Sequence, residues 1–172
     1  MGAIGRAMKA AWHELRKPAS YAKGDEFERF IRKNLFPHVY YDLLHKNYDY
    51  LTSQYFYIES SKEPDFRFRS HKSGKEFFVE AKYRSHFYQW RLEWCKTYQL
   101  RRYQVINKDT PIFIVIGVGG HPMAPERIFL VPLKDIKYTV LFQSFLKKYE
   151  ISADQRVREN DLFNIREGVY VI

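Results

Sequence analysis

The sequence predicts a mixed α/β domain in which helices cover a central β-sheet. Three observations lead to this fold class. Helical and strand-like patterns follow one another in the order helix, three strands, helix, strands, helix. The run IFIVIGV (112–118) has no polar side chain, which is typical of a strand buried on both faces. No internal repeat or Pro/Gly/Ser linker divides the 172 residues, so we expect a single domain, 1–172.

The first well-defined helix is expected in KGDEFERFIRKNLFP (23–37). Its apolar side chains recur at helical spacing on one stripe, and Pro37 ends the pattern. The stripe consists of Phe27, Phe30, Ile31 and Leu35. A weaker helical pattern precedes it at about 6–16. A tyrosine-rich segment follows at 40–60, and we expect a strand in its second half.

Two strands at about 64–70 and 76–84 come next, joined by the turn HKSGK (71–75). A helix is expected at 91–106, followed by the buried strand at 112–118. A further strand is expected at 127–133, and Pro132 argues that it is an edge strand or that it ends there. A short helix at 141–150 comes next, and the tail ending GVYVI is either a final strand or a loosely held end.

The composition favours some classes of binding partner over others. The formal net charge of +9 favours an anionic partner, nucleic acid first and an acidic membrane surface second, although a basic surface is also compatible with no such partner. Cys95 is the one cysteine, which excludes an internal disulfide and a zinc-type cysteine cluster. We find no apolar run of about 18 residues and no signal peptide, so we expect no membrane span and a cytoplasmic location.

An acid and a lysine end the second strand of the 63–84 stretch, EPDFRFRSHKSGKEFFVEAKYR. Alternation places Glu80 and Lys82 on one face together with Phe78. If the two strands pair, Asp65 lies near Glu80. Two neighbouring carboxylates repel each other unless a cation neutralises them, and Mg²⁺ is commonly held by one or two carboxylates. The set contains the groups needed for metal-assisted phosphodiester hydrolysis. The alternative is an ion pair on the wet face of a strand.

Two helices carry polar residues that fit such a site. Glu28 lies about 20° from Leu35 around the helix axis, at the edge of the apolar stripe. Gln99 is centred on the apolar stripe of 91–106, and Tyr103 follows one turn later on the same face. A glutamine on a buried stripe needs hydrogen-bond partners. The alternatives are an exposed helix acid and a polar residue at a helix edge beside a core tyrosine.

The pair PD at 64–65, followed by EAK at 80–82, resembles the signature of the PD-(D/E)xK nuclease superfamily. GDEFE at 24–28 is similar to the G-x-x-F-E pattern of the first core helix in that superfamily. QLRRY at 99–103 resembles the Q-x-x-x-Y helix motif of RecB-like nucleases. These motifs appear in the family's order within about 24–118, and 119–172 match no motif. The resemblance implies a restriction endonuclease-like core, with a central mixed β-sheet flanked by helices.

The resemblance also implies roles for individual residues. Asp65 and Glu80 would hold Mg²⁺, for which Mn²⁺ can substitute, with the Ala81 carbonyl as a further ligand. Glu28 would complete this site or help hold a second ion. Lys82 would position or help deprotonate the attacking water and steady charge on the phosphate, and Gln99 and Tyr103 would orient these groups. Basic residues near the motifs are candidate phosphate contacts, or ordinary solubility devices: Arg67, Arg69, Lys72, Arg84, Arg101 and Arg102.

We therefore expect a divalent-metal-dependent deoxyribonuclease, an endonuclease rather than an exonuclease. One active site cuts one strand, so double-strand cleavage favours a homodimer. The habits of the family suggest protein partners in a restriction, repair or mobile-element system. A second hypothesis is a non-catalytic nucleic-acid-binding or assembly module that retains the nuclease fold. A third is a small basic protein that contacts a protein partner through its tyrosine-rich segment.

Overall fold

The computed structural model describes residues 19–46 and 63–168. The helical pattern expected at 6–16, the strand expected late in the tyrosine-rich segment and the last residues of the tail, 169–172, lie outside this part of the chain.

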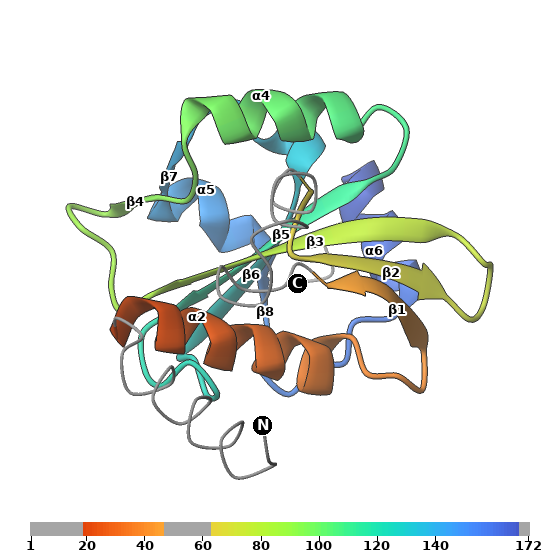
Figure 1. The fold of residues 1–172 in the computed structure, drawn as a ribbon. Helices are drawn as coiled ribbons and strands as arrows, with labels where there is room; N and C mark the ends of the chain where they lie inside the picture. Colours follow the sequence, from red (N-terminus) through yellow and green to blue (C-terminus); the bar gives the residue numbers. More distant parts are fainter. Residues whose placement is uncertain (1–18, 47–62, 169–172) are drawn as a thin grey trace, which may run out of the picture.

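A six-stranded mixed sheet forms the centre of the described structure, with strand order β1-β2-β3-β5-β6-β8 (Figure 1). Strands β3 and β5 run parallel, whereas the other neighbours in this sheet are antiparallel. A second sheet pairs β4 with β7. The bounds are β1 Tyr41–Lys46, β2 Phe66–Ser70, β3 Glu76–Arg84, β4 Arg91–Glu93, β5 Ile112–Val118, β6 Arg127–Pro132, β7 Val140–Phe142 and β8 Glu150–Ile151.

Helices cover both faces of the central sheet. Figure 1 shows α2 below the sheet and α4 above it. The helical elements are α2 Ala19–Phe30, the π-helical turn Ile31–Leu35 that continues it, α4 Thr97–Ile106, α5 Gln143–Leu146, α6 Glu159–Glu167, and short 3₁₀ turns at Leu133–Asp135 and Lys147–Tyr149. The expected α/β class, with a mixed sheet flanked by helices, is therefore confirmed.

The stripe predicted in the first helix forms its packing face, because all four of its apolar side chains are buried. The ring of Phe27 packs against Tyr83 of β3, with 5.9 Å between centroids, and lies directly over Gly117 of β5. A side chain at Gly117 would collide with that ring. Strand β5 is buried at each of its seven positions, as its continuous apolar run predicts.

Strand register decides which side chains face each helix. Phe66 pairs with Val79 and Phe68 with Phe77, and these side chains are buried on the α2 side. Alternation therefore points Glu80 and Lys82 to the opposite side, which α4 covers. The predicted hairpin is confirmed, although its first strand begins at Phe66 rather than at residue 64.

The helix predicted at 91–106 is wrong in its first part. Arg91–Glu93 forms strand β4, paired with β7, and the helix begins at Thr97. Trp94 explains the break. Its backbone N–H donates to the Thr139 carbonyl over 3.0 Å, and its indole N–H donates to the Tyr138 carbonyl over 3.0 Å. Pairing with a segment distant in sequence overrides the local helical period here.

The C-terminal third differs from the prediction in other ways. The short helix expected at 141–150 is divided among β7, α5, a 3₁₀ turn and β8. Strand β6 ends at Pro132, which agrees with the end position inferred for that proline. The sequence pattern predicted neither β1 nor α6. Each is fixed by distant contacts, such as the hydrogen bond from the Tyr41 hydroxyl to the Val157 carbonyl (3.1 Å) just before α6.

Candidate active site

Asp65, Glu80 and Lys82 lie together at the end of the β2–β3 hairpin, and we call this group the acid–lysine site. The backbone N–H of Ala81 donates to Asp65 Oδ2 over 2.8 Å, and the backbone N–H of Asp65 donates to Glu80 Oε2 over 3.3 Å. These two bonds arise because antiparallel pairing sets the residue before β2 beside the middle of β3, at Glu80. Each carboxylate thus accepts a hydrogen bond from a backbone N–H of the neighbouring strand segment: Asp65 from Ala81, and Glu80 from Asp65.

Glu80 is the centre of the site. Its side chain is 1% exposed, and Lys82 Nζ forms an ion pair with its Oε1. Gln99 Nε2 donates to the same oxygen over 3.0 Å, and the Tyr103 hydroxyl donates to Oε2 over 2.7 Å. A buried carboxylate is costly unless it is paired and hydrogen-bonded, and both requirements are met here.

Helix α4 supplies the two uncharged donors. Gln99 and Tyr103 lie one turn apart on the face of α4 that meets the sheet, and Gln99 Nε2 is also 2.9 Å from the Tyr103 hydroxyl. Tyr103 and Leu100 are buried, which anchors this face of the helix. The motif QLRRY therefore delivers its glutamine and tyrosine to one carboxylate on β3.

The charges of the site perturb one another. Burial raises the pKa of Asp65 well above its ordinary value, and the charges of Glu80 and Glu28 raise it further, while Lys82 and the Ala81 N–H oppose the shift. Burial favours the neutral form of Lys82, but its two carboxylate neighbours outweigh burial and raise its pKa. Burial and the Glu80 charge also raise the pKa of Tyr103. The acid–lysine site is thus a cluster of two carboxyl groups and one ammonium group in which burial and charge both shift the pKa values.

Glu28 occupies a different position from the other acids. It lies on α2, its carboxylate is 3.1 Å from Lys46 Nζ of β1, and its charge reaches Asp65. No group of three His, Cys, Asp or Glu side chains arranged to hold a metal ion occurs within 19–46 and 63–168. The pair Asp65 and Glu80 is thus brought together, and the charge of Glu28 acts on Asp65 from α2.

Three of the predicted phosphate contacts lie on the β2–β3 hairpin, and each of them bonds to another side chain of the protein. Arg67 and Arg69 both bind Glu76 across the hairpin, at 2.6 and 2.8 Å, and these two side chains lower the pKa of Glu76. Lys72 in the turn donates to Asn160 Oδ1 over 2.9 Å. Arg67 and Arg69 thus link the two strands of the hairpin, and Lys72 links its turn to α6, while all three add positive charge.

The other three predicted phosphate contacts lie beyond Lys82. Arg84 ends β3 and donates to the main-chain carbonyls of Glu93 (2.7 Å) and Tyr83 (2.9 Å), so no carboxylate neutralises it in these bonds. Arg101 is exposed on α4, and the Arg102 guanidinium lies 5.7 Å from the centroid of the Tyr98 ring.

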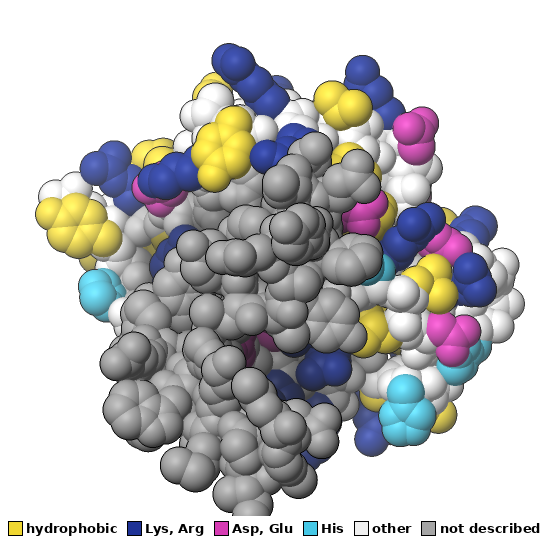
Figure 2. Space-filling model, viewed as in Figure 1, with side chains coloured by type: hydrophobic (Ala, Val, Ile, Leu, Met, Phe, Trp, Pro, Cys, Tyr) yellow, Lys and Arg dark blue, Asp and Glu magenta, His cyan; other side chains and the backbone are white. Residues whose placement is uncertain are grey.

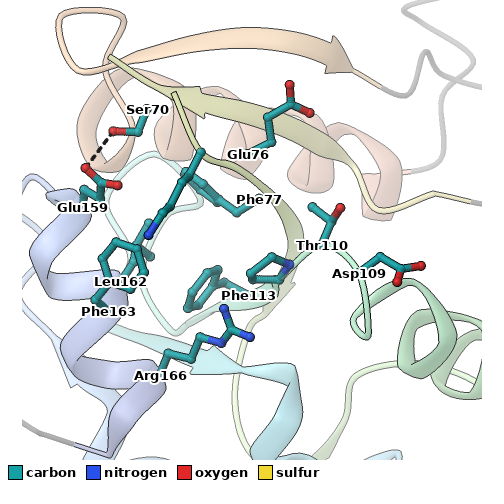
Figure 3. Close-up of a pocket in the computed structure, with 12 residues that line it drawn as sticks. Ser70, Glu76, Phe77, Asp109, Thr110, Phe113, Glu159, Leu162, Phe163 and Arg166 are labelled. Atoms are coloured by element: carbon teal, nitrogen blue, oxygen red, sulfur yellow. Dashed lines mark hydrogen bonds between the residues drawn. The ribbon is translucent and has the colours of Figure 1, made fainter. Parts of the chain in front are cut away.

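A separate hollow of about 370 Å³ lies on the α2 side of the sheet, between the hairpin, the loop before β5, and α6 (Figure 3). Phe77 and Phe113 line it from the sheet, and Leu162 and Arg166 from α6. Glu159 accepts a hydrogen bond from Ser70 over 3.1 Å at its edge. The sequence analysis missed this hollow because it did not predict α6. Its lining does not include the acid–lysine residues, which face α4.

A scan of protein-family models and a search of curated proteins each find no match for the chain. Among the described residues, no helix has both the length and the apolar character that a membrane crossing requires. Function is therefore inferred from the site alone.

Proposed function

We propose that this chain is a divalent-metal-dependent nuclease with a restriction endonuclease-like core, and that it hydrolyses DNA phosphodiester bonds. One observation supports this most strongly: a single buried carboxylate, Glu80, contacts four of the other residues that the motifs single out, while Glu28 pairs with Lys46 instead. Asp65 and Lys82 reach it from the hairpin, and Gln99 and Tyr103 reach it from α4. An ordinary surface ion pair has no need of a buried acid with donors from three segments.

The donor chemistry suits Mg²⁺ or Mn²⁺. Asp65 and Glu80 offer hard oxygen ligands, and within the described residues Asp65 Oδ1 has no hydrogen-bond donor while Oδ2 is held by Ala81. Burial, and after it the negative charges of Glu80 and Glu28, raise the pKa of Asp65, and a bound dication would favour the ionised carboxylate. A bound dication would polarise the scissile phosphate and lower the pKa of a water molecule.

The protein groups would act by position and charge. Lys82 places a positive charge beside both carboxylates, where it would hold the attacking water or a phosphate oxygen. Gln99 and Tyr103 hold the Glu80 carboxylate from two directions, so its orientation is set before substrate arrives. Arg84 at the end of β3, and Arg101 and Arg102 on α4, add positive charge and would contact phosphates outside the cleaved bond.

One observation favours the second hypothesis, a non-catalytic module that binds nucleic acid. Both oxygens of Glu80 already accept bonds from protein groups, and the described residues contain no cluster of three metal ligands. For Glu80 to bind a cation, its contact with Lys82 has to open. A module that only binds DNA would keep the ion pair between Lys82 and Glu80 intact.

Cleavage of a panel of linear, circular, single-stranded and branched DNA tests the proposal, with Mg²⁺, with Mn²⁺ and with chelator. We expect metal-dependent cutting that is lost in Asp65→Ala and in Lys82→Ala and retained in Asp154→Ala, which removes an exposed acid on the loop after β8. Cutting that survives both site substitutions would place the chemistry elsewhere.

A thermal-shift measurement gives a readout that does not depend on turnover. At a metal concentration ten times Kd, binding adds about 1.4 kcal/mol to the free energy of unfolding, or roughly 3–6 °C for a domain of this size. We expect this shift in the wild type and in Asp154→Ala, and none in Asp65→Ala. Salt-sensitive DNA binding without a metal shift and without cutting would favour the binding module.

A further inference from the structure

A tight turn at Gln89 and Trp90 follows β3. Tyr88 and Arg91 pair on either side of it through two backbone hydrogen bonds, of 2.9 Å (Tyr88 N–H to Arg91 C=O) and 3.1 Å (the reverse). Gln89 and Trp90 have φ angles of 49° and 63°, so both central residues are left-handed. Two-residue hairpin turns of this kind strongly prefer Asn-Gly, because glycine adopts positive φ without a steric penalty.

The residues at this turn are unfavourable for folding. A bulky side chain at positive φ is a genuine outlier, and such strain concentrates at functional positions. Burial does not compensate for it, because Trp90 is 75% exposed and Tyr88 is 68% exposed. The turn is nevertheless held in place, since the Trp90 carbonyl accepts a 2.8 Å hydrogen bond from the Gln143 N–H at the start of α5. A strained and anchored turn thus presents a large aromatic side chain to solvent.

The turn belongs to a strongly basic segment. Residues 84–108, from the last residue of β3 through most of its connection to β5, contain six basic side chains and one acidic side chain, a net charge of +5, and the acidic Asp109 follows directly. The acid, Glu93, is paired with Lys96 at 2.7 Å. The basic residues are Arg84, Arg91, Lys96, Arg101, Arg102 and Lys108. An excess of positive charge therefore lies in the segment that starts two residues after Lys82 and returns to the site at Gln99.

Exposed aromatic rings lie both within this segment and beside it. Tyr98 is exposed on α4 with Arg102 over its ring, and Phe142 of β7 is exposed beside Arg91 of β4. Figure 2 shows dark blue and yellow side chains next to one another along the top, where α4 lies, and on the left, where β4 lies. Cations next to exposed aromatic rings are the combination that binds single-stranded nucleic acid, because the rings stack on unpaired bases and the cations contact the backbone.

We propose that the basic segment 84–108 binds a single-stranded region of the nucleic acid, with Trp90 stacked on an unpaired base and Arg91 and Arg101 contacting neighbouring phosphates. This inference rests on the proposed function and specifies its substrate: DNA that is single-stranded or unpaired next to the cleaved bond. In a duplex, the base faces are covered by their neighbours, so an exposed tryptophan gains little from it. The net charge of +5 favours nucleic acid over an uncharged protein partner.

Fluorescence anisotropy with a labelled single-stranded oligonucleotide and its duplex tests this inference, in chelator so that no strand is cut. Stacking of one base corresponds to about 5- to 150-fold in affinity. We expect Trp90→Ala to weaken single-strand binding by that factor and duplex binding by less than about 2-fold. Trp90→Phe keeps a stacking ring and is expected to retain most of the affinity. Tyr138→Ala is the matched control, because Tyr138 is 73% exposed but lies outside the basic segment.

Trp90→Gly separates a binding role from a structural one. Glycine relieves the positive φ, so we expect a melting temperature no lower than that of the wild type together with the same loss of single-strand affinity as in Trp90→Ala. Unchanged single-strand binding in Trp90→Ala would overturn the inference, as would an equal loss in Tyr138→Ala. The same variants can be tested for binding to anionic vesicles. If Trp90→Ala weakens vesicle binding but not oligonucleotide binding, the inference is overturned in favour of a membrane surface.

The two proposals fail in different ways. Trp90-dependent binding without metal-dependent cutting would leave the inference in place and refute the nuclease. Cutting that needs Asp65 but is indifferent to Trp90 on every substrate would refute only the inference.

Discussion

Replacing Tyr103 by phenylalanine removes one hydroxyl group from the acid–lysine site and leaves the ring in the core. That hydroxyl is buried and donates a 2.7 Å hydrogen bond to the Glu80 carboxylate. Hydrogen bonds to charged groups contribute roughly 1.5–3 kcal/mol, and no solvent is available to replace this one. We therefore expect Tyr103→Phe to lower the free energy of unfolding by about 2 kcal/mol, or roughly 4–8 °C in melting temperature.

Urea denaturation in metal-free buffer measures this loss. Tyr98→Phe is the matched control on the same helix, because Tyr98 is exposed and its ring stays available to Arg102, so we expect a change within about 0.5 kcal/mol. A double-mutant cycle with Glu80→Gln should show that the two side chains are coupled. If Tyr103→Phe costs no more than Tyr98→Phe, the hydroxyl does not hold the carboxylate, and the argument for a pre-set site fails.

Three further predictions concern the framework. Gly117→Ala should cost about 1–3 kcal/mol, because its Cβ would overlap the Phe27 ring; thermal denaturation with no loss would mean that α2 can move away from the sheet. Tyr41→Phe should cost about 1–2 kcal/mol, since it leaves a buried main-chain carbonyl before α6 without its donor, and an unchanged urea midpoint would contradict this. The Arg127 guanidinium donates two 2.7 Å hydrogen bonds to Glu150 and holds the pKa of that carboxyl below its ordinary value. Stabilisation from a lowered carboxyl pKa is present above the ordinary pKa and lost as the pH falls through the folded value. Glu150→Gln should therefore be less stable than wild type by about 0.5 kcal/mol near pH 7, and this difference should disappear as the pH falls through the lowered folded pKa; a difference that widens in acid would refute the assignment.

The central features of the site follow from local periodicity. A two-residue period in β2 and β3, with a turn between them, is enough to set Asp65 beside Glu80. A helical period is enough to put Gln99 and Tyr103 on one face. The buried strand β5 is visible as an uninterrupted apolar run. Each of these signals is contained in a short stretch of the chain, so the sequence alone carries it.

Other features depend on partners distant in the sequence. Nothing local in RLE (91–93) indicates a strand, since β4 exists because β7, about 50 residues later, pairs with it. The ion pair that occupies Glu28 requires β1, which the sequence analysis did not predict. The left-handed turn at Trp90 was missed because its residues contradict the Asn-Gly preference that marks such turns. Tertiary contacts override local preference at each of these places.

The parallel pairing of β3 with β5 has a consequence for the order in which the site is assembled. The hairpin that brings the two carboxylates together needs only a five-residue turn, whereas a parallel pair needs a long crossover before it can close. Helix α4 lies in that crossover, so Gln99 and Tyr103 reach Glu80 only when the chain has returned to the sheet. A chain that has formed the hairpin but not the crossover would hold the two carboxylates without the hydrogen-bond donors of α4. We expect the crossover to close after the hairpin has formed, so that Gln99 and Tyr103 reach Glu80 later than Asp65 does.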